Sequence, residues 1–242
     1  MNINGINIPE RILTAQQKNK LVIFAGAGVS VASPSNLPNF NDLAKNVEES
    51  TFCYRKQDEP IDTYLGRVYF EGKNIYEIIA NTLSNMDSRY NDYHSNLLKL
   101  FPQDQIRLVT TNQDKHFSAA AKNIFQRDIK KYYAPALPLA KSFEGIVYLH
   151  GSIEDNLDNM VFTDSDFGEA YLVAGWASRF LKDLFNKYVI LFIGYSYNDP
   201  VMKYLSRGIE YNDNRFILTP KYNSNSEDDW QRLHITPIYF EE

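Results

Sequence analysis

The stretch LVIFAGAGVS, residues 21–30, joins a run of large apolar side chains to a turn that contains two glycines. Consecutive apolar residues at 21–24 are typical of a central parallel strand that is buried on both faces. Gly26 and Gly28 permit a tight turn and let backbone N–H groups approach a phosphate, and the helix start that follows adds favourable partial charge. The stretch therefore predicts a strand, a phosphate-binding turn and a helix, although a glycine turn without a ligand shows the same pattern.

Short β-branched runs alternate with helical patterns along most of the chain. Besides 21–24, strands are expected at 106–109, 129–133, 146–149, 188–193, 215–218 and 235–239, with a short extended piece at 160–163. Helices are expected at 12–20, 40–49, 115–125, 164–174, 176–185 and 200–207. Strands that alternate with helices imply right-handed crossovers and a mostly parallel sheet. We predict an α/β fold with a Rossmann-like, mostly parallel sheet flanked by helices.

Residues 51–101 lack a strand pattern and contain three helical stretches, at 61–70, 75–85 and 92–101. We predict a single domain over residues 1–242, with a Rossmann-like core at 12–50 and 102–242 and a small helical insertion at 51–101.

The composition, with 44% apolar and 23% charged residues, is that of a soluble globular protein. A net charge of −5 provides no overall field for nucleic acid, so direct nucleic-acid binding is not expected. Cys53 is the single cysteine, which excludes an internal disulfide and a multi-cysteine zinc ribbon, and no metal is predicted. The sequence shows neither a signal peptide nor a membrane span, so we expect a cytoplasmic protein without membrane contact.

The polar segment TTNQD, residues 110–114, stands where the strand at 106–109 ends. Asn112 can both donate and accept hydrogen bonds, which suits ribose hydroxyls or a positioned water. The carboxylate of Asp114 can accept a hydrogen bond from a carboxamide N–H, the group that marks nicotinamide. Capping of the helix that follows is the alternative role for both side chains.

His150 ends an apolar strand and precedes Gly151, which leaves open space beside the ring. An imidazole with an ordinary pKa near 6.5 can act as a base near neutral pH. A purely structural hydrogen bond is the alternative. The other histidines, His94, His116 and His234, are expected on the surface or in packing roles.

A fourth segment, GYSYNDP at residues 194–200, follows the strand at 188–193 in the same manner. Ligands of open α/β sheets bind beyond the carboxyl ends of the strands, so the four segments are expected to meet at one ligand. A phosphate turn, an amide, a carboxylate and an imidazole together favour NAD+ as that ligand.

These four segments resemble the Sir2 (sirtuin) superfamily, and more closely the SIR2-like NADase domain of bacterial antiphage defence proteins. The resemblance covers about residues 21–238 and implies catalytic roles for Asn112 and His150. The residues that it implies to bind NAD+ are Ala25, Gly26, Ala27, Gly28, Ser30, Phe40, Asp114, Gly194 and Ser196.

The chain also departs from the sirtuin pattern. Phe40 lies in PNFN, residues 38–41, where sirtuins have an acid and an arginine; it either shields the reactive carbon or packs in the core. Gln113 replaces the usual Tyr or Ile, which leaves the size of the nicotinamide pocket open. The segment between His150 and Gly194 lacks the strand that receives an acyl-lysine peptide, which argues against deacylation.

The resemblance implies an NAD+ glycohydrolase that yields nicotinamide and ADP-ribose, or cyclic ADP-ribose, and depletes NAD+ in antiviral defence by abortive infection. Such an enzyme is expected to be held inactive until triggered, as a homo-oligomer or in complex with a regulatory domain or subunit. Two alternatives stay open. One is an NAD-dependent protein deacylase, and the other is a non-catalytic module that senses NAD or ADP-ribose.

Overall fold

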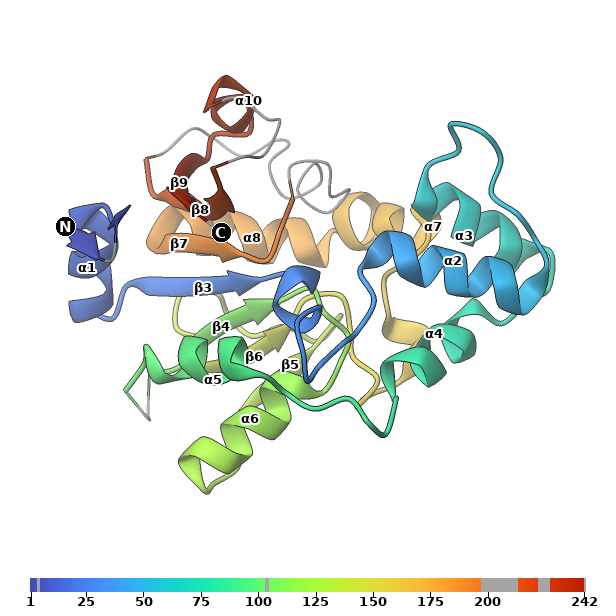
Figure 1. Cartoon of the computed structure of the whole chain (residues 1–242), viewed down its shortest axis with the longest axis horizontal. Coiled ribbons are helices and arrows are strands. Elements are labelled where there is room, and N and C mark those ends of the chain that lie inside the picture. Colours follow the sequence, from blue (N-terminus) through green and yellow to red (C-terminus); the bar gives the residue numbers. More distant parts are fainter. Residues whose placement is uncertain (4, 103–104, 197–212, 222–226, 242) are drawn as a thin grey trace.

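The computed structural model describes residues 1–3, 5–102, 105–196, 213–221 and 227–241. Its centre is a seven-stranded sheet in which every pairing is parallel (Figure 1). The strands are β3 (Leu21–Ala25), β4 (Arg107–Thr110), β5 (Lys131–Tyr133), β6 (Gly145–Tyr148), β7 (Val189–Ile193), β8 (Arg215–Pro220) and β9 (Thr236–Phe240). They lie side by side in the order β5-β6-β4-β3-β7-β8-β9. The predicted Rossmann-like α/β fold is confirmed.

Strand β3 occupies the middle of the sheet, between β4 and β7. All of its residues are buried, and successive side chains enter different layers. Val22 and Phe24 belong to the apolar cluster on one face, whereas Ile23 and Ala25 belong to the cluster on the other. A strand covered on both faces needs apolar residues at every position, which explains why the run at 21–24 shows no alternation.

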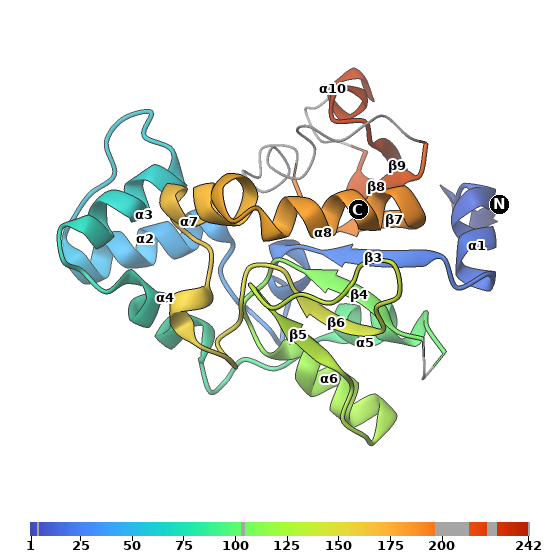
Figure 2. The same cartoon turned by 180° about the vertical axis from the view of Figure 1, so that it is seen from behind.

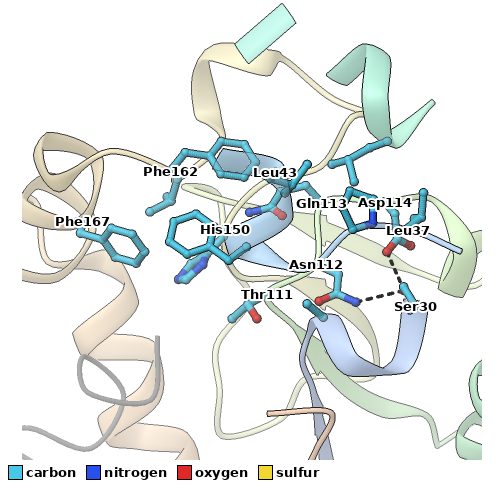
Figure 3. Close-up of a pocket in the computed structure, with 15 residues that line it drawn as sticks. Ser30, Leu37, Leu43, Thr111, Asn112, Gln113, Asp114, His150, Phe162 and Phe167 are labelled. Carbon is cyan, nitrogen blue, oxygen red and sulfur yellow. Dashed lines mark hydrogen bonds between the residues drawn. The ribbon is translucent and has the colours of Figure 1, made fainter. Parts of the chain in front are cut away.

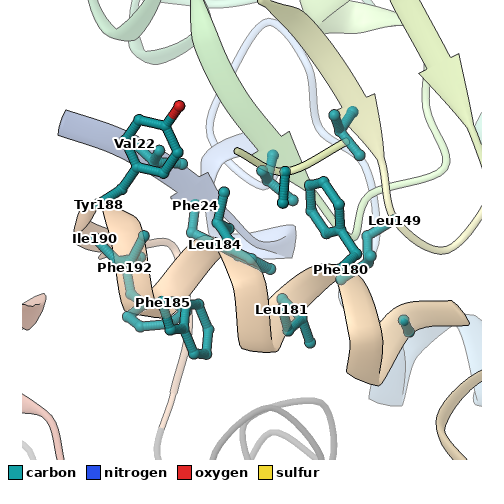
Figure 4. Packing of buried hydrophobic residues seen from close by; sticks show 14 of the residues in the cluster. Val22, Phe24, Leu149, Phe180, Leu181, Leu184, Phe185, Tyr188, Ile190 and Phe192 are labelled. Atoms are coloured by element: carbon teal, nitrogen blue, oxygen red, sulfur yellow. The ribbon is translucent and has the colours of Figure 1, made fainter. Parts of the chain in front are cut away.

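Helix α8 (Trp176–Lys187) covers the first of these faces (Figure 4). Leu181, Leu184 and Phe185 of this helix belong to the same buried cluster as the side chains of the sheet. The Phe185 ring lies 6.4 Å from the ring of Phe24. Burying side chains of this size contributes about 1.5–3 kcal/mol each, so this layer is a large part of what holds the helix to the sheet.

The opposite face is covered by helices that come from distant parts of the chain (Figure 2). They are α1 (Glu10–Gln17), α5 (Asp92–Lys99) and α6 (His116–Phe125). Their buried apolar residues, among them Leu98 of α5 and Phe117 of α6, join Ile23 in a second cluster. The sheet is therefore the middle layer of three.

A third cluster lies beyond the carboxyl ends of the strands, where α2 (Phe40–Thr51), α3 (Ile61–Phe70) and α4 (Ile75–Leu83) pack together (Figure 1). Met160 and Phe162, from the segment after β6, complete this cluster. The predicted helix at 61–70 is confirmed as α3. Helix α5 packs instead in the second cluster, on one face of the sheet. The three helices expected in the insertion therefore separate into two groups, with α3 and α4 in the third cluster and α5 in the second. The division into core and insertion stays a prediction.

Some local predictions differ from the structure. The extended piece at 160–163 forms no ladder. Its Met160 and Phe162 enter the third cluster, Val161 enters the cluster of Val22 and Phe24, and Thr163 caps the next helix. The helix expected at 164–174 is α7 (Asp164–Gly168) followed by a π-helical turn, η3 (Glu169–Val173). The helix expected at 200–207 lies outside the described residues.

Short elements complete the chain. They are the antiparallel hairpin of β1 (Asn2–Ile3) and β2 (Ile6–Asn7), the 3-10 turns η1 (Ala27–Ser30) and η2 (Leu157–Asn159), and helix α10 (Glu227–Arg232). Within the described ranges, none of the helices combines the length and the apolar character that crossing a bilayer requires.

Candidate functional site

A pocket opens at the carboxyl ends of β3, β4 and β6 (Figure 3). The space between its walls is about 570 Å³, which includes the part of the mouth that is open to solvent. Its polar wall consists of Ser30, Thr111, Asn112, Gln113, Asp114 and His150. Its apolar wall consists of Ala27, Leu37, Pro38, Phe40, Leu43, Leu83, Val161, Phe162 and Phe167.

The register of the sheet brings these segments together. Ala25, the last residue of β3, pairs with Thr110 of β4, and Thr110 pairs with Tyr148 of β6. The three strands therefore end at the same level, and the residues that follow them enter one space. Six predicted site residues line this pocket: Ala27, Ser30, Phe40, Asn112, Asp114 and His150.

The side chain of Ser30 connects the first two segments. Its Oγ donates to Asp114 Oδ2 at 2.8 Å, and Asn112 Nδ2 donates to Ser30 Oγ at 3.2 Å. All three residues are buried. Figure 3 shows the Asn112 carboxamide with its nitrogen towards Ser30 and its oxygen turned away. This contact fixes the orientation of the amide within the pocket.

Asp114 also caps the helix that follows it, which is the alternative role expected from the sequence. Its Oδ1 accepts a hydrogen bond of 2.8 Å from the backbone N–H of His116, the first residue of α6. One carboxylate oxygen thus holds the helix start, while the other faces Ser30 and the pocket. Capping and ligand contact are compatible at this residue, because a carboxylate offers about four acceptor sites.

His150 is buried beside two aromatic rings. Its Nε2 lies 2.9 Å from the hydroxyl of Tyr171, and its ring meets that of Phe167 edge-on at 5.4 Å. Burial lowers the pKa of His150 to about 3, so the ring is neutral at physiological pH. In this state the imidazole acts as a neutral hydrogen-bonding group, with one nitrogen facing the Tyr171 hydroxyl.

Tyr171 is a residue that sequence reasoning missed. It lies in the π-helical turn η3, which the apolar periodicity predicted only as ordinary helix. Its backbone carbonyl accepts a 2.6 Å hydrogen bond from Ser178 Oγ. No local pattern indicates that its hydroxyl meets a histidine at the end of β6.

The glycine turn packs tightly against the fourth segment. A Cβ on Gly28 would lie 2.8 Å from Gly194 Cα, and one on Gly26 would lie 2.7 Å from the Tyr195 ring. Gly194 itself has a φ of +76°, which favours glycine. The packing of two backbone segments therefore requires these glycines, whether or not a phosphate is bound.

Two amides of this turn already have partners. The N–H of Gly26 donates to Ile193 O and the N–H of Gly28 donates to Gly194 O, both at 2.9 Å. A phosphate at the turn must use other donors, so pyrophosphate binding by Gly26 and Gly28 stays a prediction.

The remaining predicted residues lie outside the pocket lining. Ala25 is fully buried, and its carbonyl accepts from the Tyr195 hydroxyl at 3.1 Å. Gly194 adjoins the glycine turn, while Ser196 is exposed. Their contact with NAD+ stays a prediction, and the last four residues of the segment at 194–200 lie outside the described residues.

Of the two roles expected for His94 and His116, the structure shows packing and not a surface position, because both side chains are buried. His94 Nε2 lies 3.1 Å from Ser30 Oγ, and His116 Nε2 lies 2.8 Å from Ser88 Oγ. The available sequence signal was Asn91, three residues before His94, at the predicted start of a helix. Asn91 and His94 form a capping box there, which turns the imidazole inwards.

The parallel sheet and the polar pocket beyond its strand ends define a Rossmann-like α/β protein with a candidate ligand site. The family described as SIR2-like domain matches residues 106–238, which is more than half of the chain. The chain therefore belongs to the SIR2-like domain family, as its motifs predicted.

Two relatives align with nearly the whole chain. Uncharacterized protein y4cA of Sinorhizobium fredii (strain NBRC 101917 / NGR234) is 30% identical over 271 residues, which cover 98% of this chain and 22% of the relative. NAD(+) hydrolase ThsA of Cytobacillus dafuensis is 26% identical over 265 residues, which cover 95% of this chain and 51% of the relative. This chain thus spans about a fifth and about half of the lengths of these relatives.

Proposed function

We propose that this chain binds NAD+ and hydrolyses the bond between nicotinamide and ribose, releasing nicotinamide and ADP-ribose. The observation that carries the proposal is that Asn112 and His150, from the ends of two adjacent strands, line one pocket together with Asp114. Membership of the SIR2-like family and similarity to a protein named NAD(+) hydrolase support NAD+ as the substrate.

The chemistry needs positioning more than proton transfer to the leaving group. Nicotinamide leaves as a neutral molecule, and C1′ of the ribose develops oxocarbenium character. The protein must hold both ends of the substrate and place a water, which are effects of orientation and electrostatics. The fixed carboxamide of Asn112 suits the ribose hydroxyls or that water.

Charge and shape of the pocket fit this reaction. The carboxylate of Asp114 stands in the polar wall, where it stabilises positive charge on the substrate and can accept from the nicotinamide carboxamide. The neutral imidazole of His150 accepts a hydrogen bond from a ribose hydroxyl or from the attacking water. Phe40, which also packs against the third cluster, supplies an apolar wall beside the reacting carbon.

The test is nicotinamide release from NAD+ by the wild-type chain, Asn112→Ala and His150→Ala. Removal of a positioned polar or acid–base group is expected to lower kcat by about 10²–10⁴-fold. Asn123→Ala, on the exposed side of α6, and His234→Ala are the matched controls and should retain wild-type rates. Wild type that releases no nicotinamide when tested assembled and with its trigger contradicts the proposal. Variants equal to wild type contradict the catalytic assignment.

A second candidate function is binding of NAD+ or ADP-ribose without turnover. It is favoured by the hydrogen bond between His150 and Tyr171, which occupies one nitrogen of the predicted catalytic imidazole. Titration calorimetry would then show saturable binding while nicotinamide release is absent. Acylated peptide added to the same assay tests the deacylase alternative.

We further propose that the activity is held in check in the cell, because depletion of NAD+ would harm its own host. A homo-oligomer, a regulatory subunit or a further domain would supply this control. The role in antiviral defence rests on the family resemblance alone. Quantifying NAD+ in infected cells that carry wild type or His150→Ala tests this role.

A further inference from the structure

A buried hydrogen-bonding network lies behind the pocket and centres on Ser30. We propose that His94 is a positioning residue that acts through the Ser30 hydroxyl to hold Asn112 and Asp114 in their working orientations. This inference rests on the proposed function and extends it to a residue that does not itself line the pocket.

The hydroxyl of Ser30 has contacts for its full hydrogen-bonding capacity. A hydroxyl has one proton and two acceptor lone pairs. The proton is directed to Asp114 Oδ2 at 2.8 Å, because a carboxylate can only accept. Asn112 Nδ2 donates to the oxygen at 3.2 Å, and His94 Nε2 lies 3.1 Å from it, close enough to donate when that nitrogen carries the ring proton. Loss of the imidazole removes one of three contacts that fix this hydroxyl.

The imidazole of His94 is held rigidly on its other side. Its Nδ1 lies 3.2 Å from the backbone nitrogen and 2.7 Å from the Oδ1 of Asn91. Its ring meets the ring of Phe117 edge-on at 4.8 Å. With no exposed surface, the ring has no room to turn away from Ser30.

Asn91 also ties this network to the glycine turn. Its Nδ2 donates to Val29 O at 2.9 Å and to Ala32 O at 3.1 Å, on either side of Ser30 in the chain. The backbone and the side chain of Ser30 are thus fixed from α5, an element that follows it by about sixty residues. The network places the hydroxyl before any ligand arrives, which is the preorganisation that a catalytic site requires.

A double-mutant cycle tests whether His94 acts through Ser30. The variants are Ser30→Ala, His94→Ala and the double variant, with kcat and KM measured for nicotinamide release. A misplacement of about 1 Å at the reacting groups lowers kcat by about 10²-fold, and we expect each single variant to approach that loss with little change in KM. The double variant should lose no more kcat than the more severely impaired single variant, since the losses of residues that act as a unit do not multiply. Losses that multiply overturn the inference.

Two further variants separate positioning from folding. His94→Gln keeps an N–H donor within reach of Ser30 and should recover a large part of kcat. His116→Gln is the matched control: its ring is also buried and lies 5.3 Å from that of His94, but its Nε2 faces Ser88. If His116→Gln lowers kcat as much as His94→Ala does, the loss comes from disturbing the buried packing in general and not from the contact with Ser30. The inference then fails.

Crystal structures of wild type and His94→Gln and His94→Ala give a readout that needs no activity. In His94→Ala, displacement of the Ser30 hydroxyl or the Asn112 carboxamide by more than about 0.5 Å is expected, the tolerance of a working site. Unchanged positions contradict the inference even if the enzyme is active. If wild type releases no nicotinamide, the proposed function is contradicted but this inference is not. The positions of the Ser30 hydroxyl and the Asn112 carboxamide in the variant structures then still test the role of His94.

Discussion

The Nε2 atom of His150 lies 2.9 Å from the hydroxyl of Tyr171, so the predicted catalytic imidazole is tethered to a π-helical turn. The two residues are 21 positions apart, and both are buried. The tether sets the orientation of the ring, because Nε2 is held against the Tyr171 hydroxyl.

Tyr171→Phe removes this tether and keeps the ring stacking. Leaving a buried ring nitrogen without its partner is expected to lower the free energy of unfolding by about 1 kcal/mol. Because His150 loses its fixed orientation, nicotinamide release should fall roughly tenfold, less than in His150→Ala. Urea denaturation and the release assay measure the two effects. Full activity in Tyr171→Phe would show that the hydroxyl does not orient the base.

Acid should destabilise the chain through its buried histidines. Burial lowers the pKa of His150 to about 3 and that of His94 to about 4, the latter against the opposing effect of Asp114. In the unfolded state a histidine binds its proton with an ordinary pKa of about 6.5. The stability that each buried neutral histidine contributes is therefore fully present above that pH and is lost as the pH falls towards the folded-state pKa. The slope contributed by each histidine is at most about 1.4 kcal/mol per pH unit.

Urea denaturation of wild type and His150→Gln between neutral pH and pH 4 checks this dependence. The variant should show a shallower loss of stability, while His234→Gln should follow wild type. Parallel curves for wild type and His150→Gln would mean that His150 is not buried as a neutral group.

Gly28→Ala should destabilise the chain by about 1–3 kcal/mol, the usual effect of overpacking. Its new methyl group would meet the backbone of Gly194 at 2.8 Å, and backbone cannot turn aside as a side chain can. Gly168→Ala is the matched control, since nothing lies within 4 Å of the position of its Cβ. Thermal denaturation of both variants is the measurement. Equal melting temperatures would show that the two segments are not packed as described.

Asp114→Asn should weaken the binding of NAD+ while preserving most of the fold. The variant keeps an oxygen for the N–H of His116 but loses the negative charge that faces the pocket. A hydrogen bond to a charged group is worth about 1.5–3 kcal/mol, so KM should rise at least tenfold. Asp155→Asn, an exposed acid outside the pocket, should leave KM unchanged. Calorimetric titration with NAD+ separates weaker binding from slower turnover.

The amino-acid sequence by itself determined the layered α/β fold and the place of the pocket. Apolar runs such as 21–24 and the polar segment at 110–114 are local patterns, because burial on both faces and a strand end each impose their own residue types. Asn112 and His150 could be found in this way, since each directly follows a recognisable strand.

Only the tertiary structure decided which side chains meet. Ser30 contacts His94 across 64 positions, Gly28 packs against Gly194, and His150 meets Tyr171. Periodicity reports that a residue is buried, but not which distant residue lies opposite, because that depends on how whole layers pack. Asn91 indicates that His94 turns inwards, but only the fold shows that its ring lies behind Ser30.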